Sequence, residues 1–158
     1  MKKFRAFQID NIKEKISTRF CDLELDDLSE GDTIIKVKHS TINYKDALAA
    51  TGKGKILRKF PLIGGIDLSG VIVNTSSTSL EIGDTVVVNG SGLSEVRDGG
   101  YTEYARMPAE LIVKLPGNID SHKAMQIGTA GYTAALAIHQ MELNGQNPEK
   151  GPILVSGA

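Results

Sequence analysis

The sequence has little of several features that would point to particular classes of protein. Its 158 residues include a single cysteine, Cys21, which excludes an internal disulfide framework and favours a reducing, cytoplasmic location. Eighteen basic and 19 acidic residues give a formal net charge of −1, which argues against nucleic-acid or membrane-surface binding through bulk charge. No run approaches the ~18 apolar residues of a membrane span. No apolar segment follows the basic start, so no signal peptide is expected.

Metal-binding and serine-hydrolase patterns are also missing. The three histidines, His39, His122 and His139, stand far apart in the sequence, and neither Cys-x-x-Cys nor His-Glu-x-x-His occurs. We therefore expect no metal site, and no zinc in particular. Without a Gly-x-Ser-x-Gly elbow, a serine hydrolase has no support.

What the sequence does contain is typical of a turn-rich β domain. Its 17 glycines are spread along the chain between short apolar runs. Alternating or apolar stretches bounded by turn residues predict strands at residues 4–9, 32–39, 70–73, 81–88, 100–105 and 111–114. Six such strands predict a small barrel or sandwich, so the expected class is mainly β with helices, α+β.

Two segments have the pattern of helices. Asn43–Ala50 predicts a short helix with Gly52 as its C-terminal stop. Ser121–Leu143 predicts a longer helix, capped by Asp120 or by its own first residue. Two glycines within residues 128–131 should break or kink this second helix.

The character of the chain changes near residue 120, which predicts a domain of residues 1–120 followed by residues 121–158. The last segment, Ile153–Ala158, is an apolar β-branched run that ends in a small residue, Gly157 and an alanine. It has the pattern of a parallel strand that enters a phosphate-binding turn. A C-terminal edge strand is the alternative interpretation.

Asn43 and Tyr44 are the first candidate catalytic residues. A tyrosine at the start of a short helix can point its phenol into a cleft and donate a proton or hydrogen bond to a developing oxyanion, with the Asn43 amide nearby. Alternatively, Tyr44 and Leu48 form a buried i, i+4 pair and Asn43 is only the helix cap.

Asp67 and Thr129 each stand among glycines. Asp67 lies within Gly64–Gly70, where it can orient a neighbouring base or arginine or contact a substrate, or simply belong to a structural turn. Thr129 lies in Gly128-Thr129-Ala130-Gly131, where small residues let a flat ligand approach the backbone or let the helix pack closely on another element.

A basic loop follows the first predicted helix. It can bind the phosphates of an anionic substrate, with Arg58 as the named candidate, or it is a solvated loop face. Its members are Lys53, Lys55, Arg58 and Lys59.

Taken in order, the motifs are more specific than any one of them. Asn-Tyr-Lys-Asp-Ala-Leu, Phe-Pro-Leu-Ile-Gly-Gly-Ile-Asp-Leu-Ser-Gly, Asp-Gly-Gly-Tyr-Thr-Glu-Tyr, Gly-Thr-Ala-Gly-Tyr-Thr-Ala and Val-Ser-Gly-Ala follow one another. This series resembles the medium-chain dehydrogenase/reductase superfamily, and within it the YhdH/YhfP-type quinone oxidoreductases, the group that contains the acrylyl-CoA reductases. The resemblance extends over essentially all 158 residues, but over only about the first half of a typical member.

The resemblance implies a GroES-like β domain followed by a Rossmann domain that binds NADPH, of which residues 121–158 would be a truncated start. It implies that Tyr44 contacts the nicotinamide, with Asn43 beside it in the active-site motif. Thr129 would lie near the nicotinamide, and Gly157 would be the first glycine of the nucleotide-binding fingerprint. Members of the family are often homodimers.

The chain departs from the zinc alcohol dehydrogenases of the same superfamily at Gly65-Ile66-Asp67, where those enzymes carry Gly-His-Glu. Ile66 therefore replaces the zinc histidine. The resemblance implies a zinc-independent, NADPH-dependent reductase of enoyl thioesters, enones or quinones. We expect the 158 residues to be an N-terminal fragment that is inactive alone. A GroES-like interaction module without catalysis is the alternative, and neither the substrate nor the choice of NADPH over NADH follows from these residues.

Overall fold

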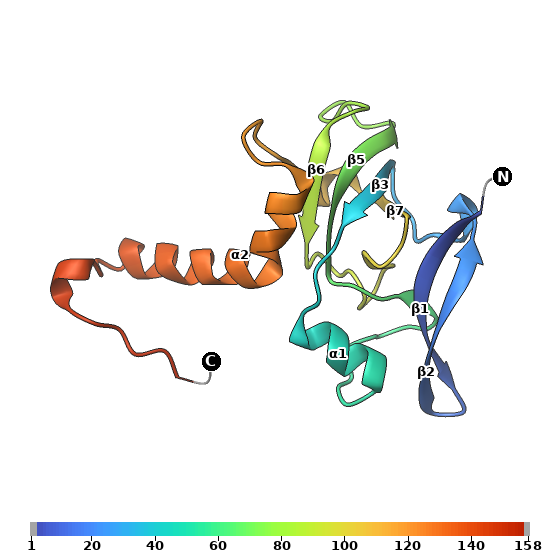
Figure 1. Ribbon diagram of the computed structural model, residues 1–158, viewed down its shortest axis with the longest axis horizontal. Coiled ribbons are helices and arrows are strands. Elements are labelled where there is room, and N and C mark those ends of the chain that lie inside the picture. The colour runs from blue at the N-terminus through green and yellow to red at the C-terminus, as the bar shows by residue number, and fades with distance from the viewer. Residues whose placement is uncertain (1–2, 157–158) are drawn as a thin grey trace.

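Two antiparallel sheets form most of the computed structural model, which describes residues 3–156 (Figure 1). The first sheet has the strand order β2-β1-β4 and the second has the order β7-β3-β5-β6-β8. The strands are β1 Phe4–Ile12, β2 Lys15–Leu23, β3 Thr33–His39, β4 Leu62–Ile63, β5 Asp67–Thr75, β6 Thr85–Asn89, β7 Tyr104–Met107 and β8 Val113–Lys114. The expected mainly β class with two helices is confirmed.

The helices α1 Tyr44–Thr51 and α2 Ser121–Leu143 stand outside the sheets, with short 3₁₀ turns at Leu25–Asp27, Ala109–Leu111 and Pro148–Lys150. The predicted stop of α1 is confirmed, because Gly52 takes the left-handed conformation that favours glycine, with φ of 70°. Asp120 caps α2 by accepting a hydrogen bond from the Lys123 N–H at 2.7 Å. Within the described residues, no helix is long and apolar enough to cross a membrane.

The core of the larger sheet is built from alternate residues of its strands, because successive side chains of a strand face opposite ways. Ile35, Leu68 and Val86 come from three neighbouring strands and are fully buried. A smaller cluster around Phe4 and Ile63 fills the space under the first sheet. Burying these side chains fixes the register that brings the first residue of β5 to the candidate site described below.

The prediction of strands missed β2 and the short β4, and it included one strand that the structure does not form. The long strand β2 was not predicted, because its residues are mostly exposed and partly polar and carry no strict alternation. Ile153–Ser156 does not form the predicted strand: these residues are without regular structure and exposed, Leu154 to 91%. An apolar run becomes a strand only when another strand satisfies its backbone, and no strand of the described chain pairs with this one.

The helix α2 changes direction at Gly128, as predicted. Its first part packs against β5, β6 and β3, whereas the part after Gly128 extends away from the sheets (Figure 1). Its outer half exposes Leu136, Ile138 and Leu143. The domain boundary near residue 120 stays a prediction.

Candidate active site

Asp67, the first residue of β5, joins the candidate residues. Its side chain is fully buried. One carboxylate oxygen, Oδ2, accepts hydrogen bonds from Thr41 Oγ1 at 2.5 Å, Asn43 Nδ2 at 3.0 Å and Thr129 Oγ1 at 2.8 Å. The Thr129 N–H reaches the same oxygen at 3.2 Å, and Oδ1 accepts the Thr41 N–H at 2.9 Å. We call Thr41, Asn43, Asp67 and Thr129 the Asp67 cluster.

The break in α2 brings Thr129 to the cluster. Gly128 has φ of 54° and ψ of −164°, a conformation outside the helix that suits glycine. A Cβ on Gly128 would lie 3.1 Å from Thr41 Cγ2. The break therefore turns the Thr129 N–H away from the helix and lets it donate to Asp67.

A close backbone approach holds Asp67 from the other side. A Cβ on Gly100 would lie 2.1 Å from the Asp67 carbonyl oxygen, so only glycine fits at this position. The next residue, Tyr101, donates its hydroxyl to the Thr41 carbonyl oxygen at 2.9 Å. Burial, together with the nearby Asp46 carboxylate, raises the pKa of the Tyr101 phenol, which therefore stays protonated and remains a donor.

Asp67 is held ionised by its donors. Burial alone would raise the pKa of its carboxyl, but the hydrogen bonds from Thr41, Asn43 and Thr129 outweigh this effect and lower the pKa below its ordinary value of 3.8. Among residues 3–156 no lysine, arginine or histidine forms an ion pair with this carboxylate. The structure therefore does not support the expectation that Asp67 orients a base or an arginine; it orients hydroxyl and amide groups instead.

Asn43 is both a helix cap and a member of the cluster. Asp46 Oδ2 accepts the Asn43 N–H at 2.8 Å, and Asp46 Oδ1 accepts the Ile66 N–H at 3.0 Å. Because a carboxylate only accepts, the amide nitrogen of Asn43 must face Asp67. The two interpretations of Asn43 are thus compatible.

Tyr44 lies at the edge of this arrangement. Its side chain is 81% exposed, so the alternative in which it forms a buried pair with Leu48 is wrong. Within the described chain the Tyr44 hydroxyl makes no hydrogen bond, which leaves it available to a ligand.

Arg58 is not brought to the cluster. Arg58 is exposed, and its backbone N–H donates to the Glu95 carbonyl oxygen at 2.8 Å. Gly157 lies outside the described residues. The roles of all the site residues remain proposals.

Sequence reasoning missed Thr41 and Tyr101. Thr41 stands two residues before Asn43, and nothing in its local pattern separates it from an ordinary loop threonine. Tyr101 carries a signal that went unused: it follows Gly99-Gly100, and paired glycines often mark a close backbone approach.

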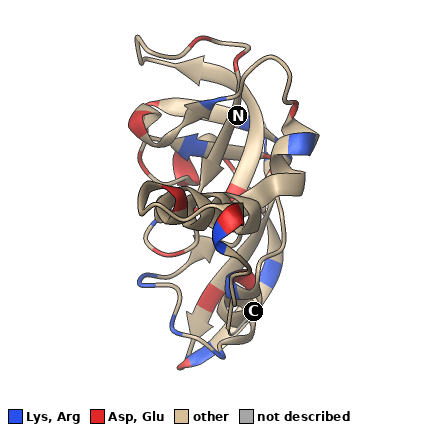
Figure 2. Cartoon of the chain, turned by 90° about the vertical axis from the view of Figure 1, so that its left-hand side faces the viewer, with Lys and Arg blue, Asp and Glu red and all other residues tan. Residues whose placement is uncertain are grey.

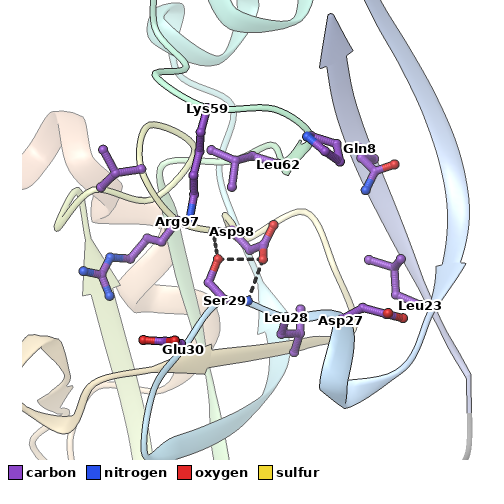
Figure 3. Close-up of a pocket in the computed structure, with 12 residues that line it drawn as sticks. Gln8, Leu23, Asp27, Leu28, Ser29, Glu30, Lys59, Leu62, Arg97 and Asp98 are labelled. Carbon is purple, nitrogen blue, oxygen red and sulfur yellow. Dashed lines mark hydrogen bonds between the residues drawn. The ribbon is translucent and has the colours of Figure 1, made fainter.

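A cavity of about 780 Å³ lies elsewhere in the molecule (Figure 3). There Asp98 accepts hydrogen bonds from the N–H and the Oγ of Ser29, both at 2.8 Å, and from the Ile63 N–H at 2.9 Å. No residue of the Asp67 cluster lines this cavity.

No group of three or more histidine, cysteine or acidic side chains within residues 3–156 is arranged to hold a metal ion. His39 and His122, far apart in the sequence, do come together, with ring centroids 5.3 Å apart and Ser121 Oγ 3.2 Å from His39 Nδ1. The sequence carried no signal of this pairing.

Residues 29–117 match the alcohol dehydrogenase GroES-like domain. The chain belongs to this family. The YhfP protein of Bacillus subtilis is 43% identical over 155 residues, which are 98% of this chain and 47% of YhfP. The acrylyl-CoA reductase AcuI of Ruegeria pomeroyi is 40% identical over 157 residues, 98% of this chain and 48% of AcuI.

Solved structures agree with the sequence comparison. The structure of B. subtilis YhfP with NAD bound has a TM-score of 0.94 and 41% identity, covering 99% of this chain and 48% of YhfP. Escherichia coli YhdH with bound NADPH has a TM-score of 0.89 and 40% identity, covering 92% of this chain and 45% of YhdH. The resemblance to the YhdH/YhfP type is confirmed, and the chain spans about half the length of the curated relatives it matches.

Proposed function

We propose that this chain supplies the catalytic residues of a zinc-independent, NADPH-dependent reductase that acts on activated double bonds or quinones. The supporting observation is the Asp67 cluster, which brings Asn43 and Thr129 together from distant parts of the chain, with the exposed Tyr44 directly after Asn43 in the sequence. The names of the relatives support the reaction class, since they include an acrylyl-CoA reductase and proteins solved with NAD or NADPH.

The residues at the helix break fit the nicotinamide end of such a cofactor. Thr129 directs its hydroxyl hydrogen and its N–H to Asp67, so the remaining lone pairs of Oγ1 can accept from an uncharged donor such as a carboxamide. Gly128 and Ala130 carry little or no side chain, which lets a flat ring approach the backbone. When bound, a reduced nicotinamide would supply hydride to the β-carbon of an enoyl thioester or enone.

The chain's own residues then have separate roles. Hydride addition moves an electron pair onto the substrate carbonyl oxygen, and the Tyr44 hydroxyl donates a hydrogen bond to the negative charge that develops there. Asp67 is a positioning residue that acts through Asn43 and Thr129. Water supplies the proton that ends on the α-carbon. Ile66 stands where zinc dehydrogenases carry a histidine, and conjugate reduction does not require a Lewis acid at that position.

The test uses the full-length protein, meaning these 158 residues with any sequence that continues them in the gene. In this protein we expect Tyr44→Phe to lower kcat for acrylyl-CoA about 100-fold, the loss typical of an oxyanion donor, with little change in the affinity for NADPH. Tyr132→Phe, which removes the hydroxyl of a half-exposed tyrosine on α2, is the control.

An unchanged kcat in Tyr44→Phe would contradict the role of this residue. Absence of NADPH oxidation with thioesters, enones and quinones would contradict the proposed function and favour the interaction module. The 158-residue polypeptide alone is expected to show no turnover, because the described residues offer no cradle for a dinucleotide beyond the helix break.

A further inference from the structure

An open apolar groove of about 490 Å³ lies between α1 and the β1–β2 hairpin. Phe20 is 66% exposed and Ile42 is 87% exposed, so large apolar surfaces in or beside the groove face water. On the side of α1, Ala47 and Ala50 leave room for a ligand because their side chains are single methyl groups. The lining residues are Phe7, Phe20, Ile42, Asp46, Ala47, Ala50 and Tyr101.

One end of the groove reaches the candidate active site. Ile42 directly precedes Asn43 and Tyr44 in the chain. Tyr101 lines the groove and donates its hydroxyl to the Thr41 carbonyl oxygen, while Thr41 itself donates to Asp67. The Ile42 end of the groove therefore lies next to the segment that carries Asn43 and Tyr44.

Beyond the other end of the groove the chain is rich in lysine. At the end of α1, a Cβ on Gly52 would lie 2.8 Å from Ile16 Cγ1, so the helix end and the hairpin meet there. Four lysines lie near this meeting point in the sequence, two before Ile16 and two after Gly52, and the neighbouring acidic residues are Asp10 and Glu14. Figure 2 shows basic segments in the lower half of the picture, with acidic ones among them. We call Lys13, Lys15, Lys53 and Lys55 the lysine rim.

The spacing of the two ends sets the shape of the ligand. The eight residues of α1 span about 12 Å. None of the four rim lysines forms an ion pair within residues 3–156, so their charges are available to an anion. The ligand that fits has a reactive head, a neutral arm of at least that length and an anionic tail.

We propose that the groove binds the arm of an acyl-coenzyme A thioester, with the acyl group at Tyr44 and the phosphates at the lysine rim. This assignment rests on the proposed function and selects the thioester among its substrates, because a quinone has neither the long arm nor the anionic tail.

The experiment compares acryloyl-CoA with acryloyl-N-acetylcysteamine, a thioester that has the same reactive group but lacks the phosphates and most of the arm. In the full-length protein, Lys53→Glu with Lys55→Glu should raise KM for acryloyl-CoA about tenfold and leave KM for the short thioester unchanged. Ala50→Trp, which fills the groove, should have the same selective effect. Lys36→Glu with Lys38→Glu is the control, since it reverses two exposed lysines at the same spacing on β3.

A rise in KM for acryloyl-CoA but not for the short thioester supports the groove. This difference between the wild type and the lysine variant should shrink as salt is added, because salt screens the attraction between lysines and phosphates. Equal KM changes for both thioesters, or a charge-reversed rim that changes neither, overturns it. If Ala50→Trp does not fold, the lysine variant decides alone. Calorimetry measures the binding of coenzyme A to the wild-type protein and to the rim variant without any turnover, so its result does not depend on the proposed function. Equal affinities overturn the groove. Weaker binding by the rim variant supports it, even if the proposed function is wrong.

Discussion

Replacement of Asp67 by asparagine tests the cluster on which the candidate site depends. The carboxylate accepts five hydrogen bonds of 3.2 Å or less, four on Oδ2 and one on Oδ1. An asparagine has the same shape but only one acceptor oxygen. In its better orientation the amide oxygen keeps the four donors, while the NH₂ group opposes the Thr41 N–H.

The expected cost follows from these contacts. One buried donor left unsatisfied costs about 1–3 kcal/mol, and hydrogen bonds to a neutral acceptor are each weaker than those to a charged one by about 0.5–1 kcal/mol. Removing a buried charge offsets part of this loss. We expect Asp67→Asn to lower the free energy of unfolding at pH 7 by about 3 kcal/mol.

The effect depends on pH with a defined sign. The pKa of Asp67 in the folded protein lies below its ordinary value of 3.8, so its contribution to stability is fully present above that value and is lost as the pH falls through the folded-state pKa. Asp67→Asn lacks this contribution at every pH. The difference in stability between the wild type and the variant should therefore narrow on acidification.

Urea titrations at pH 7 and near pH 3, followed by circular dichroism, measure both effects. Asp98→Asn is the matched control, because Asp98 also ties two chain segments together but is only partly buried; it should cost about 1 kcal/mol. A loss below 1 kcal/mol for Asp67→Asn, or a loss that is as large near pH 3 as at pH 7, would refute this account of the cluster.

Three further predictions concern the surroundings of the cluster. Gly128→Ala should lower the free energy of unfolding by about 1–3 kcal/mol in urea titrations, because a Cβ at φ of 54° is strained and lies against Thr41, whereas Gly117→Ala, where a Cβ meets open space, should change it little. Gly100→Ala should prevent folding, seen as loss of the native circular dichroism spectrum, because its Cβ would lie 2.1 Å from the Asp67 carbonyl oxygen; a native-like variant would contradict this packing. Tyr101→Phe should cost about 1 kcal/mol in urea titrations and remove a phenol that titrates above the ordinary range in an ultraviolet pH titration, since Tyr101 has a raised pKa.

Some features of the protein follow from the sequence alone. The limits of α2, the break at Gly128 and the glycine stop of α1 were predicted, because caps, glycines and periodicity act over a few residues. The ordered motifs also led to the family, since each marks a backbone position that only certain residues allow. Asn43, Tyr44, Asp67 and Thr129 were selected in this way, one motif at a time.

Only the tertiary structure decided how these motifs meet. Asp67 contacts Thr41, Asn43 and Thr129, which lie 24 to 62 residues away in the sequence, because strand register and the glycine at position 128 bring three segments to one buried carboxylate. The structure also showed Tyr44 exposed and Ile153–Ser156 without a partner strand. Local patterns report what a segment can form, whereas burial and strand pairing depend on what the rest of the chain places beside it.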